Sequence, residues 1–139
     1  LGLGLRALGE ARDHALEREQ FGKPLARLST VAQSLATAWT DLEAARGLIN
    51  AAVGAHERRA AGGSLDARAR AAGSMAKWYA TEAAQRAIDA CVQVMGARGV
   101  LSGGRMEALY REVRALRIYE GASEIQGLLV ARELMEQEG

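Results

Sequence analysis

A continuous helical pattern fills residues 31–52, which read VAQSLATAWTDLEAARGLINAA. The apolar positions advance by alternating steps of four and three residues, which keeps one face of a helix turned toward a neighbour for several turns. The members of this stripe are Val31, Leu35, Ala38, Leu42, Ala45, Ile49 and Ala52. A second stripe of the same spacing comprises Ala72, Ala76, Tyr79, Ala83, Ala87, Ala90 and Val94. Together the two stripes predict a hairpin of two long antiparallel helices.

Glycines, charges and caps indicate where these helices begin and end. The first long helix is predicted from about Ser29 to Arg59, because arginines suit the negative end of a helix dipole and two glycines follow them. The next helix is predicted to begin at an N-cap region formed by Ser64 and Asp66 and to run to Gly96.

Shorter helices are predicted on either side of this hairpin. A helix over Leu3–Glu19 stops at the turn FGKP, residues 21–24, where glycine and proline prevent continuation. After Gly96 we expect an irregular, glycine-rich connection with a short helical piece around Met106–Arg111. The closing helix is predicted over Ser123–Glu136, with Ser123 and Gln126 at the spacing of a capping box. Its expected apolar face consists of Ile125, Leu128, Leu129 and Leu134.

Composition supports an all-α fold in one domain, residues 1–139. The chain has 29 alanines and one proline, and only 4% of its residues are aromatic, so small faces and aliphatic side chains must form the core. We therefore predict an up-down four-helix bundle. Because the sequence opens inside a helical pattern, we also expect it to be part of a longer chain.

Charge and cysteine content exclude several classes of partner. The formal net charge is +1, which predicts neither a nucleic-acid partner nor binding to an anionic membrane, and no apolar run is long enough to span a bilayer. The lone cysteine, Cys91, cannot form an intramolecular disulfide, so we expect a reducing compartment and a cytoplasmic protein.

The side chains most often used in catalysis have structural explanations here. Glu10, His14 and Glu17 can share a helix face, which we interpret as a solvated salt-bridge face and not as a metal site. His56 is interpreted as a core or capping residue, and Cys91 as a small core residue. The two tryptophans are predicted to fill the core or an interface.

Three short segments do not fit such explanations. They read REQFGKPL (residues 18–25), QVMGARG (93–99) and YREVRALRIYEGASEIQ (110–126). In this order, and separated by two long helices, they resemble the C-terminal helical domain of the acyl-CoA dehydrogenases, and the resemblance covers nearly the whole chain. The third segment is the most specific, because the family pattern is Tyr-Arg-Asp followed by Arg-x-x-x-Ile-Tyr-Glu-Gly-Thr-Ser-Glu-Ile-Gln.

The resemblance implies a flavoprotein that removes two hydrogens from the α and β carbons of an acyl-CoA thioester. A hydride passes to FAD, and the electrons later pass to an electron-transferring flavoprotein. Glu120 matches the catalytic base, whose own backbone N–H also helps to bind the thioester oxygen in this family. Gly121 is then a substrate-binding position where the chain passes close to the acyl group.

The resemblance also implies FAD contacts that cross between subunits. Arg18 matches an arginine that binds the FAD pyrophosphate, with Phe21 beside it. The other implied cofactor contacts are Gln93, Gly96, Ala97, Ser123 and Glu124. A homodimer, commonly paired into a tetramer, follows. The family's N-terminal helical domain and middle β-domain are absent from these residues, so we expect a C-terminal part of a longer chain that is inactive by itself.

Three departures from the family pattern leave other functions open. Ala97 replaces the second glycine of Gln-x-x-Gly-Gly, Ala122 replaces the usual threonine after Glu-Gly, and Ser29 stands where many members have a flavin-contacting glutamine. One alternative is therefore a non-catalytic oligomerisation module or a flavin-deficient partner subunit of the same fold. Another is an oxidase or nitroalkane-oxidising relative, which the Glu120-Gly121 pair disfavours.

Overall fold

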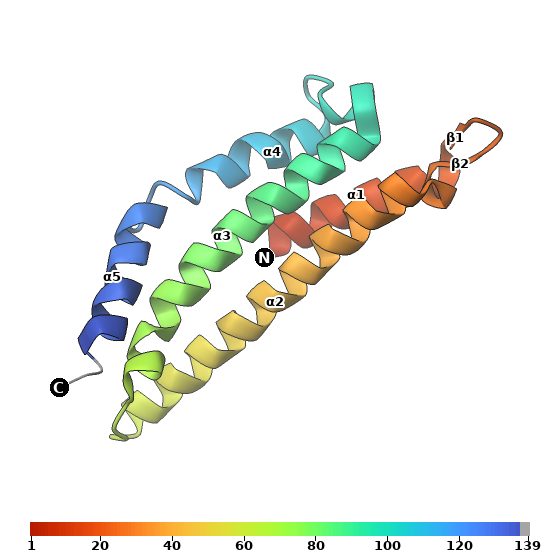
Figure 1. The fold of residues 1–139 in the computed structure, drawn as a ribbon. Helices are drawn as coiled ribbons and strands as arrows, with labels where there is room; N and C mark the ends of the chain where they lie inside the picture. The colour runs from red at the N-terminus through yellow and green to blue at the C-terminus, as the bar shows by residue number, and fades with distance from the viewer. Residues whose placement is uncertain (137–139) are drawn as a thin grey trace.

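The computed structural model describes residues 1–136 and consists mainly of α-helices (Figure 1). The helices are α1 (Gly2–Glu17), α2 (Ser29–Ala60), α3 (Ala67–Met95), α4 (Arg105–Ala115) and α5 (Ser123–Met135). The connections contain the antiparallel strands β1 (Glu19–Gln20) and β2 (Lys23–Pro24) and the 3₁₀ helices η1 (Leu25–Arg27) and η2 (Gly96–Gly99). The all-α prediction is confirmed.

The α2–α3 hairpin forms the most extensive contact in the molecule (Figure 1). Both predicted stripes face inward: Leu42 and Ala45 on α2, and Ala83 on α3, are completely buried. Alanine faces of this kind let two helix backbones approach closely over many turns. The hairpin predicted from the spacing is therefore confirmed.

The predicted boundaries of the long helices are also confirmed. Asp66 is the N-cap of α3, and its Oδ1 accepts a hydrogen bond of 2.7 Å from the Ala69 N–H. After α2 the chain turns at Gly62, whose φ of +80° favours glycine. Helix α1 ends at Glu17, two residues earlier than predicted, because the chain turns into β1.

Helix α3 is the centre of the fold, because α1, α2, α4 and α5 all pack against it. One buried cluster joins three of these helices. Its members are Ala7 and Ala11 of α1, Ala84, Ile88 and Cys91 of α3, and Met106, Leu109 and Val113 of α4. The three buried residues of α4 repeat at helical spacing, so the helix is longer than the predicted short piece. The described residues therefore contain five α-helices where four were expected.

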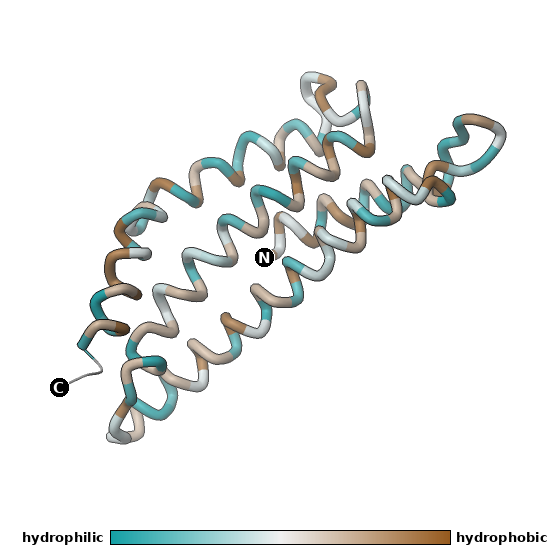
Figure 2. The backbone as a smooth tube through the Cα atoms, in the orientation of Figure 1, coloured by the Kyte–Doolittle hydropathy of each residue, from teal (hydrophilic) through white to brown (hydrophobic). Residues whose placement is uncertain are grey.

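Helix α5 turns a different face inward from the one predicted. Ile125, Leu128 and Leu134 are 50–67% exposed, whereas Ser123 and Gln126 are buried. The N-cap is Ala122 and no side chain caps the helix, so the expected capping box is not formed. The predicted apolar face was wrong because polar groups of α3 bind the polar side of α5. In Figure 2, apolar residues accordingly alternate with polar ones along α5.

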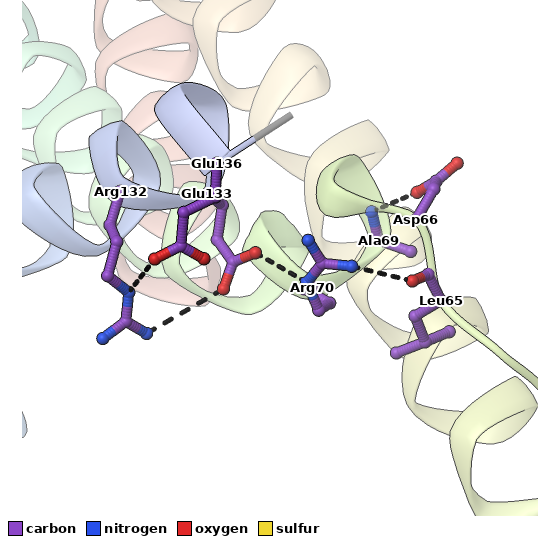
Figure 3. A network of polar contacts seen from close by, with 7 residues as sticks. All are labelled: Leu65, Asp66, Ala69, Arg70, Arg132, Glu133 and Glu136. Atoms are coloured by element: carbon purple, nitrogen blue, oxygen red, sulfur yellow. Dashed lines mark hydrogen bonds and ion pairs between the residues drawn. The ribbon is translucent and has the colours of Figure 1, made fainter. Parts of the chain in front are cut away.

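An ion pair joins the beginning of α3 to the end of α5. Arg70 Nε lies 2.6 Å from Glu133 Oε2, and Arg70 Nη1 also donates to the Leu65 carbonyl (Figure 3). Between this pair and the start of α5, the Trp78 ring lies against Gly127 of α5. These contacts hold α5 along α3.

Other interpretations of single residues need correction. His14 is buried, not part of a solvated face, and the Arg98 guanidinium lies 3.4 Å from its Nδ1. His56, expected in the core or as a cap, is exposed. Trp39 is 60% exposed and Trp78 40%, so neither is a core residue in this chain, and the interface remains the prediction for both.

Membrane-spanning helices and metal-binding clusters are both absent from the described residues. No helix within residues 1–136 is long and apolar enough to cross a bilayer. In the same range, no group of three His, Cys, Asp or Glu side chains is arranged as metal ligands would be.

Cys91 is a buried core residue, as predicted, and burial raises the pKa of its thiol to about 12. Because the thiolate is the reactive form, we expect iodoacetamide at pH 8 to leave Cys91 unmodified in the folded protein and to alkylate it rapidly in urea. Mass spectrometry over a time course measures both rates. Equal rates in the two conditions would contradict the buried placement.

Overpacking the face of α3 tests its role as the central helix. Ala84 is completely buried, and its Cα would lie 3.5 Å from a Cβ added to Gly4 of α1. We expect Ala84→Leu to lower the free energy of unfolding in urea by about 1–3 kcal/mol. Ala44→Leu, at an exposed position of α2, is the matched control, for which we expect a change within about 0.5 kcal/mol.

Candidate active site

The link between α4 and α5 contains a turn of unusual backbone conformation. Glu120 has a φ of +54° and Gly121 a φ of +85°. Among residues 1–136, the non-glycine residues with positive φ are Phe21 and Glu120. A left-handed non-glycine residue costs about 1–3 kcal/mol and persists only where the surroundings hold it. Both residues belong to the segments that sequence analysis singled out.

Hydrogen bonds from two helices hold the Glu120-Gly121 turn. Gln126 Nε2 of α5 donates to the carbonyl oxygens of Glu120 and Gly121, at 3.3 Å each. Lys77 Nζ of α3 donates to the Gly121 carbonyl at 2.5 Å. A Cβ on Gly121 would lie only 2.5 Å from Gln126 Nε2. The φ of Gly121 therefore favours glycine, and a Cβ at this position would also displace the Gln126 amide.

One carboxylate of α3 binds the chain on both sides of the turn. Glu82 Oε1 accepts hydrogen bonds of 2.7 Å from Arg117 Nε and from Ser123 Oγ. The Ser123 N–H in turn donates to the Arg117 carbonyl at 3.1 Å. Burial alone raises the pKa of Glu82, but the hydrogen bonds from Ser123 and Arg117 and the nearby Arg86 charge together lower it. Glu82 is therefore ionised at neutral pH.

The Glu120 side chain itself is exposed and has no hydrogen bond or ion pair with any other residue in the range 1–136. Its backbone N–H has no acceptor in this range either. Exposed apolar side chains lie nearby in the sequence, namely Ile118, Tyr119 and Ile125. The chain thus fixes the backbone of Glu120 and leaves its carboxylate and its amide N–H available to another group.

The predicted FAD contacts of the first segment lie at the β1–β2 turn. Phe21 and Gly22, with φ of +54° and +75°, form the two-residue loop of this hairpin, and the Phe21 side chain is 88% exposed. Arg18 follows the end of α1, where its N–H donates to the His14 carbonyl at 2.8 Å. Its guanidinium is exposed and forms no ion pair within residues 1–136.

The second segment lies at the C-terminus of α3. Gln93, Gly96 and Ala97 are exposed, and Gly96 has a φ of +57° with open space where a Cβ would be. The contact between His14 and Arg98 joins this end of α3 to the end of α1. Burial, together with the charges of Arg98 and Arg18, lowers the pKa of His14, which favours a neutral ring that accepts from Arg98.

The structure brings two of the three segments to the same end of the molecule and places the third elsewhere. Figure 1 shows the β1–β2 turn and η2 toward one end, with the α4–α5 link farther along α3. Glu82, which binds that link, precedes Gln93 by 11 residues, or about 16 Å of helix. Glu120 therefore does not share one cavity with Arg18 and Gln93 of the same chain.

The exposed groups of the first two segments, at Arg18, Gln93 and Gly96, match the chemistry of a flavin dinucleotide. A free guanidinium suits a pyrophosphate, and an exposed amide and an open glycine suit close approach of a polar ligand. At α5 the Ser123 hydroxyl and N–H are both used within the chain, whereas the N–H groups of Glu124 and Ile125 have no acceptor among residues 1–136. A phosphate contact at this helix would therefore use the amides of Glu124 and Ile125.

The structure also shows where the departures from the family pattern lie. Ala97 is exposed on η2, and Ser29 is exposed at the first residue of α2. Ala122 is half-buried and forms the N-cap of α5. Each of these three side chains lies next to a predicted FAD contact or at a helix start, but none disturbs the local fold.

Sequence reasoning missed Lys77 and Glu82. Both lie on the predicted third helix, but periodicity shows only which face is apolar and not which polar residue meets another element. One signal was available, since Lys77 is one of two lysines in an arginine-rich sequence and follows a run of small residues. Gln126 was noticed, but as part of a capping box.

Comparison with known proteins identifies the family of the chain. The sequence model described as "Acyl-CoA dehydrogenase, C-terminal domain" matches residues 1–135. The chain is 37% identical over 135 residues to "Acyl-CoA dehydrogenase" of Bacillus subtilis, covering 97% of this chain and 34% of the relative. It is 33% identical over 137 residues to "Caffeyl-CoA reductase-Etf complex subunit CarC" of Acetobacterium woodii, covering 99% of this chain and 34% of that protein.

A solved structure has the same fold. A putative acyl-CoA dehydrogenase from Mycobacterium abscessus superposes with a TM-score of 0.88 at 30% identity, covering 99% of this chain and 33% of that one. The chain thus spans about one third of the length of the curated relatives it matches. Because the family model matches nearly the whole chain, the chain belongs to the acyl-CoA dehydrogenase family, whose C-terminal domain it matches.

Proposed function

We propose that this chain is the C-terminal domain of a longer, FAD-dependent enzyme that catalyses α,β-dehydrogenation of an acyl-CoA thioester, with Glu120 as the base. The observation that carries the proposal is the left-handed Glu120-Gly121 turn, which α3 and α5 hold by hydrogen bonds while its carboxylate stays free. Strain of this kind at a polar residue is typical of functional positions. The family match and the motif around Glu120 support the same assignment.

In the proposed reaction, the Glu120 carboxylate takes the proton from the α carbon of the thioester. The free backbone N–H of Glu120 stabilises the negative charge that develops on the thioester oxygen. Bound FAD supplies the acceptor for the hydride that leaves the β carbon. The pair of electrons from the α C–H bond becomes the new double bond, so one proton and one hydride leave the substrate. In the reverse direction, Glu120 returns the proton to the α carbon.

Separation of Glu120 from Arg18 and Gln93 within one chain supports a homo-oligomer, in which each copy lends FAD contacts to its neighbour. The exposed apolar residues of α5 are consistent with burial in such an assembly. The related CarC protein is named as a subunit of an Etf complex, which supports an electron-transferring flavoprotein as partner. The same proposal includes a cytoplasmic location. It also includes an assembly that is either a dimer or a tetramer.

A second function remains open, namely a non-catalytic oligomerisation module or a flavin-deficient partner subunit. Ala97 and Ala122 favour it, because each stands where the family pattern has another residue next to the flavin site. The two functions differ in a simple observation: a catalytic subunit purifies as a yellow protein, whereas a flavin-deficient one does not.

Glu120→Gln tests the proposed base in the full-length protein. Because glutamine cannot accept the α proton, we expect bleaching of the flavin by acyl-CoA to slow at least ~100-fold, whereas FAD content stays the same. Stopped-flow absorbance with straight-chain thioesters from butyryl-CoA to palmitoyl-CoA measures the rate. Glu124→Gln is not a neutral control, because Glu124 is a predicted FAD contact. The control is Glu43→Gln, at an exposed position of α2. Undiminished bleaching in Glu120→Gln would remove Glu120 from this role.

Arg18→Met tests the proposed contact with the FAD pyrophosphate. Loss of a hydrogen bond to a charged group costs about 1.5–3 kcal/mol, so we expect the Kd of FAD to rise roughly 10- to 100-fold. Flavin fluorescence after dilution and ultrafiltration measures the released FAD. The control is Arg12→Met, an exposed arginine of α1 paired with Asp13, which we expect to leave FAD bound. Equal FAD release by both variants would contradict the contact.

A further inference from the structure

We propose that Lys77 and Glu82 of α3 are positioning residues for Glu120, which they hold by binding the backbone and side chains of the α4–α5 link. This inference rests on the function proposed above. Neither residue forms a hydrogen bond with the Glu120 carboxylate, so both act on it indirectly. Both lie on α3, which has more buried residues than any other helix in the described part of the chain and against which the other α-helices pack.

The Lys77 contact acts directly on the strained peptide. Its ammonium group donates to the Gly121 carbonyl at 2.5 Å, and a charged donor makes a stronger bond than a neutral one. Gln126 donates to the same carbonyl from the opposite element, α5, at 3.3 Å. The Gly121–Ala122 peptide, which completes the turn, is therefore held from two sides. Without Lys77, the carbonyl oxygens of the turn keep only the longer and uncharged contacts from Gln126.

The Glu82 contact fixes the chain on either side of Glu120. Arg117 precedes Glu120 by three residues and Ser123 follows it by three, and both donate to the same oxygen, Glu82 Oε1, at 2.7 Å. Because the Ser123 N–H also binds the Arg117 carbonyl, the link closes into a compact loop with its ends at Glu82. Ionised Glu82 thus binds both ends of the loop to α3.

Simple packing of α5 on α3 does not require these contacts. The same two helices are also joined by Arg70 and Glu133, at 2.6 Å, close to the other end of α5 (Figure 3). That pair has a similar distance and links the same helices, but it lies far along α5 from the turn. It therefore provides a matched control that separates helix docking from placement of Glu120.

The test uses the full-length, FAD-loaded protein with the acyl-CoA that bleaches the wild type fastest. We expect Lys77→Met and Glu82→Gln to slow bleaching roughly 10- to 100-fold, because proton transfer is sensitive to displacements of about 1 Å. The half-saturating acyl-CoA concentration is expected to change less than about threefold, since substrate binding is not the step affected. Lys77→Arg, which keeps a charged donor, is expected to restore most of the rate. Glu133→Gln is expected to bleach like the wild type.

Hydrogen exchange gives a readout that does not depend on turnover. In Lys77→Met and Glu82→Gln, we expect faster amide exchange in the peptide covering residues 117–123, with little change in the rest of α5. Glu133→Gln is expected to leave exchange in 117–123 unchanged. Should Lys77→Met or Glu82→Gln fail to fold, Ser123→Ala removes a single hydrogen bond to Glu82 and is expected to give a smaller change of the same sign.

The outcomes separate this inference from the function on which it rests. If Glu120→Gln abolishes bleaching while Lys77→Met and Glu82→Gln bleach at the wild-type rate, the positioning role is refuted and the base remains. An equal loss in Glu133→Gln would also refute it, since helix docking would then explain the effect. If Glu120→Gln bleaches normally, the proposed function fails, and the positioning role fails with it.

Discussion

The close packing of small residues along α3 is the constraint on which the rest of the structure depends. Alanines on this helix allow α1, α2 and α4 to approach its backbone, and Ile88 and Cys91 fill the space that remains. With three sides of α3 occupied by apolar contacts, its fourth side is left to polar residues. That polar side receives α5 and the link before it, so the packing of the core determines where Glu120 is placed.

Local patterns were sufficient to predict the parts of the fold that depend on one helix at a time. The stripes of α2 and α3 predicted the hairpin, and Asp66 and Gly62 predicted its boundaries, because periodicity, capping and positive φ are properties of a few neighbouring residues. The family motif then directed attention to Glu120, and the structure shows this residue in an unusual backbone conformation.

Contacts between distant segments were beyond such patterns. The inward face of α5 was wrongly predicted because Leu128 and Leu134 are apolar, whereas the partners of this helix on α3 include an arginine, a tryptophan and a glutamate. His14 was misplaced for a related reason, since its partner Arg98 is more than eighty residues away in sequence. Lys77 and Glu82 were missed because one helix cannot reveal which segment binds it.

Two turns of the protein have a bulky residue, Phe21 or Glu120, at a positive φ that favours glycine. Replacing either residue by glycine relieves backbone strain, so the isolated domain gains stability while an aromatic ring or a carboxylate disappears. Directed evolution toward heat resistance alone would therefore tend to erase both positions. The phenylalanine and the glutamate at these two positions therefore each leave the folded chain less stable than a glycine would.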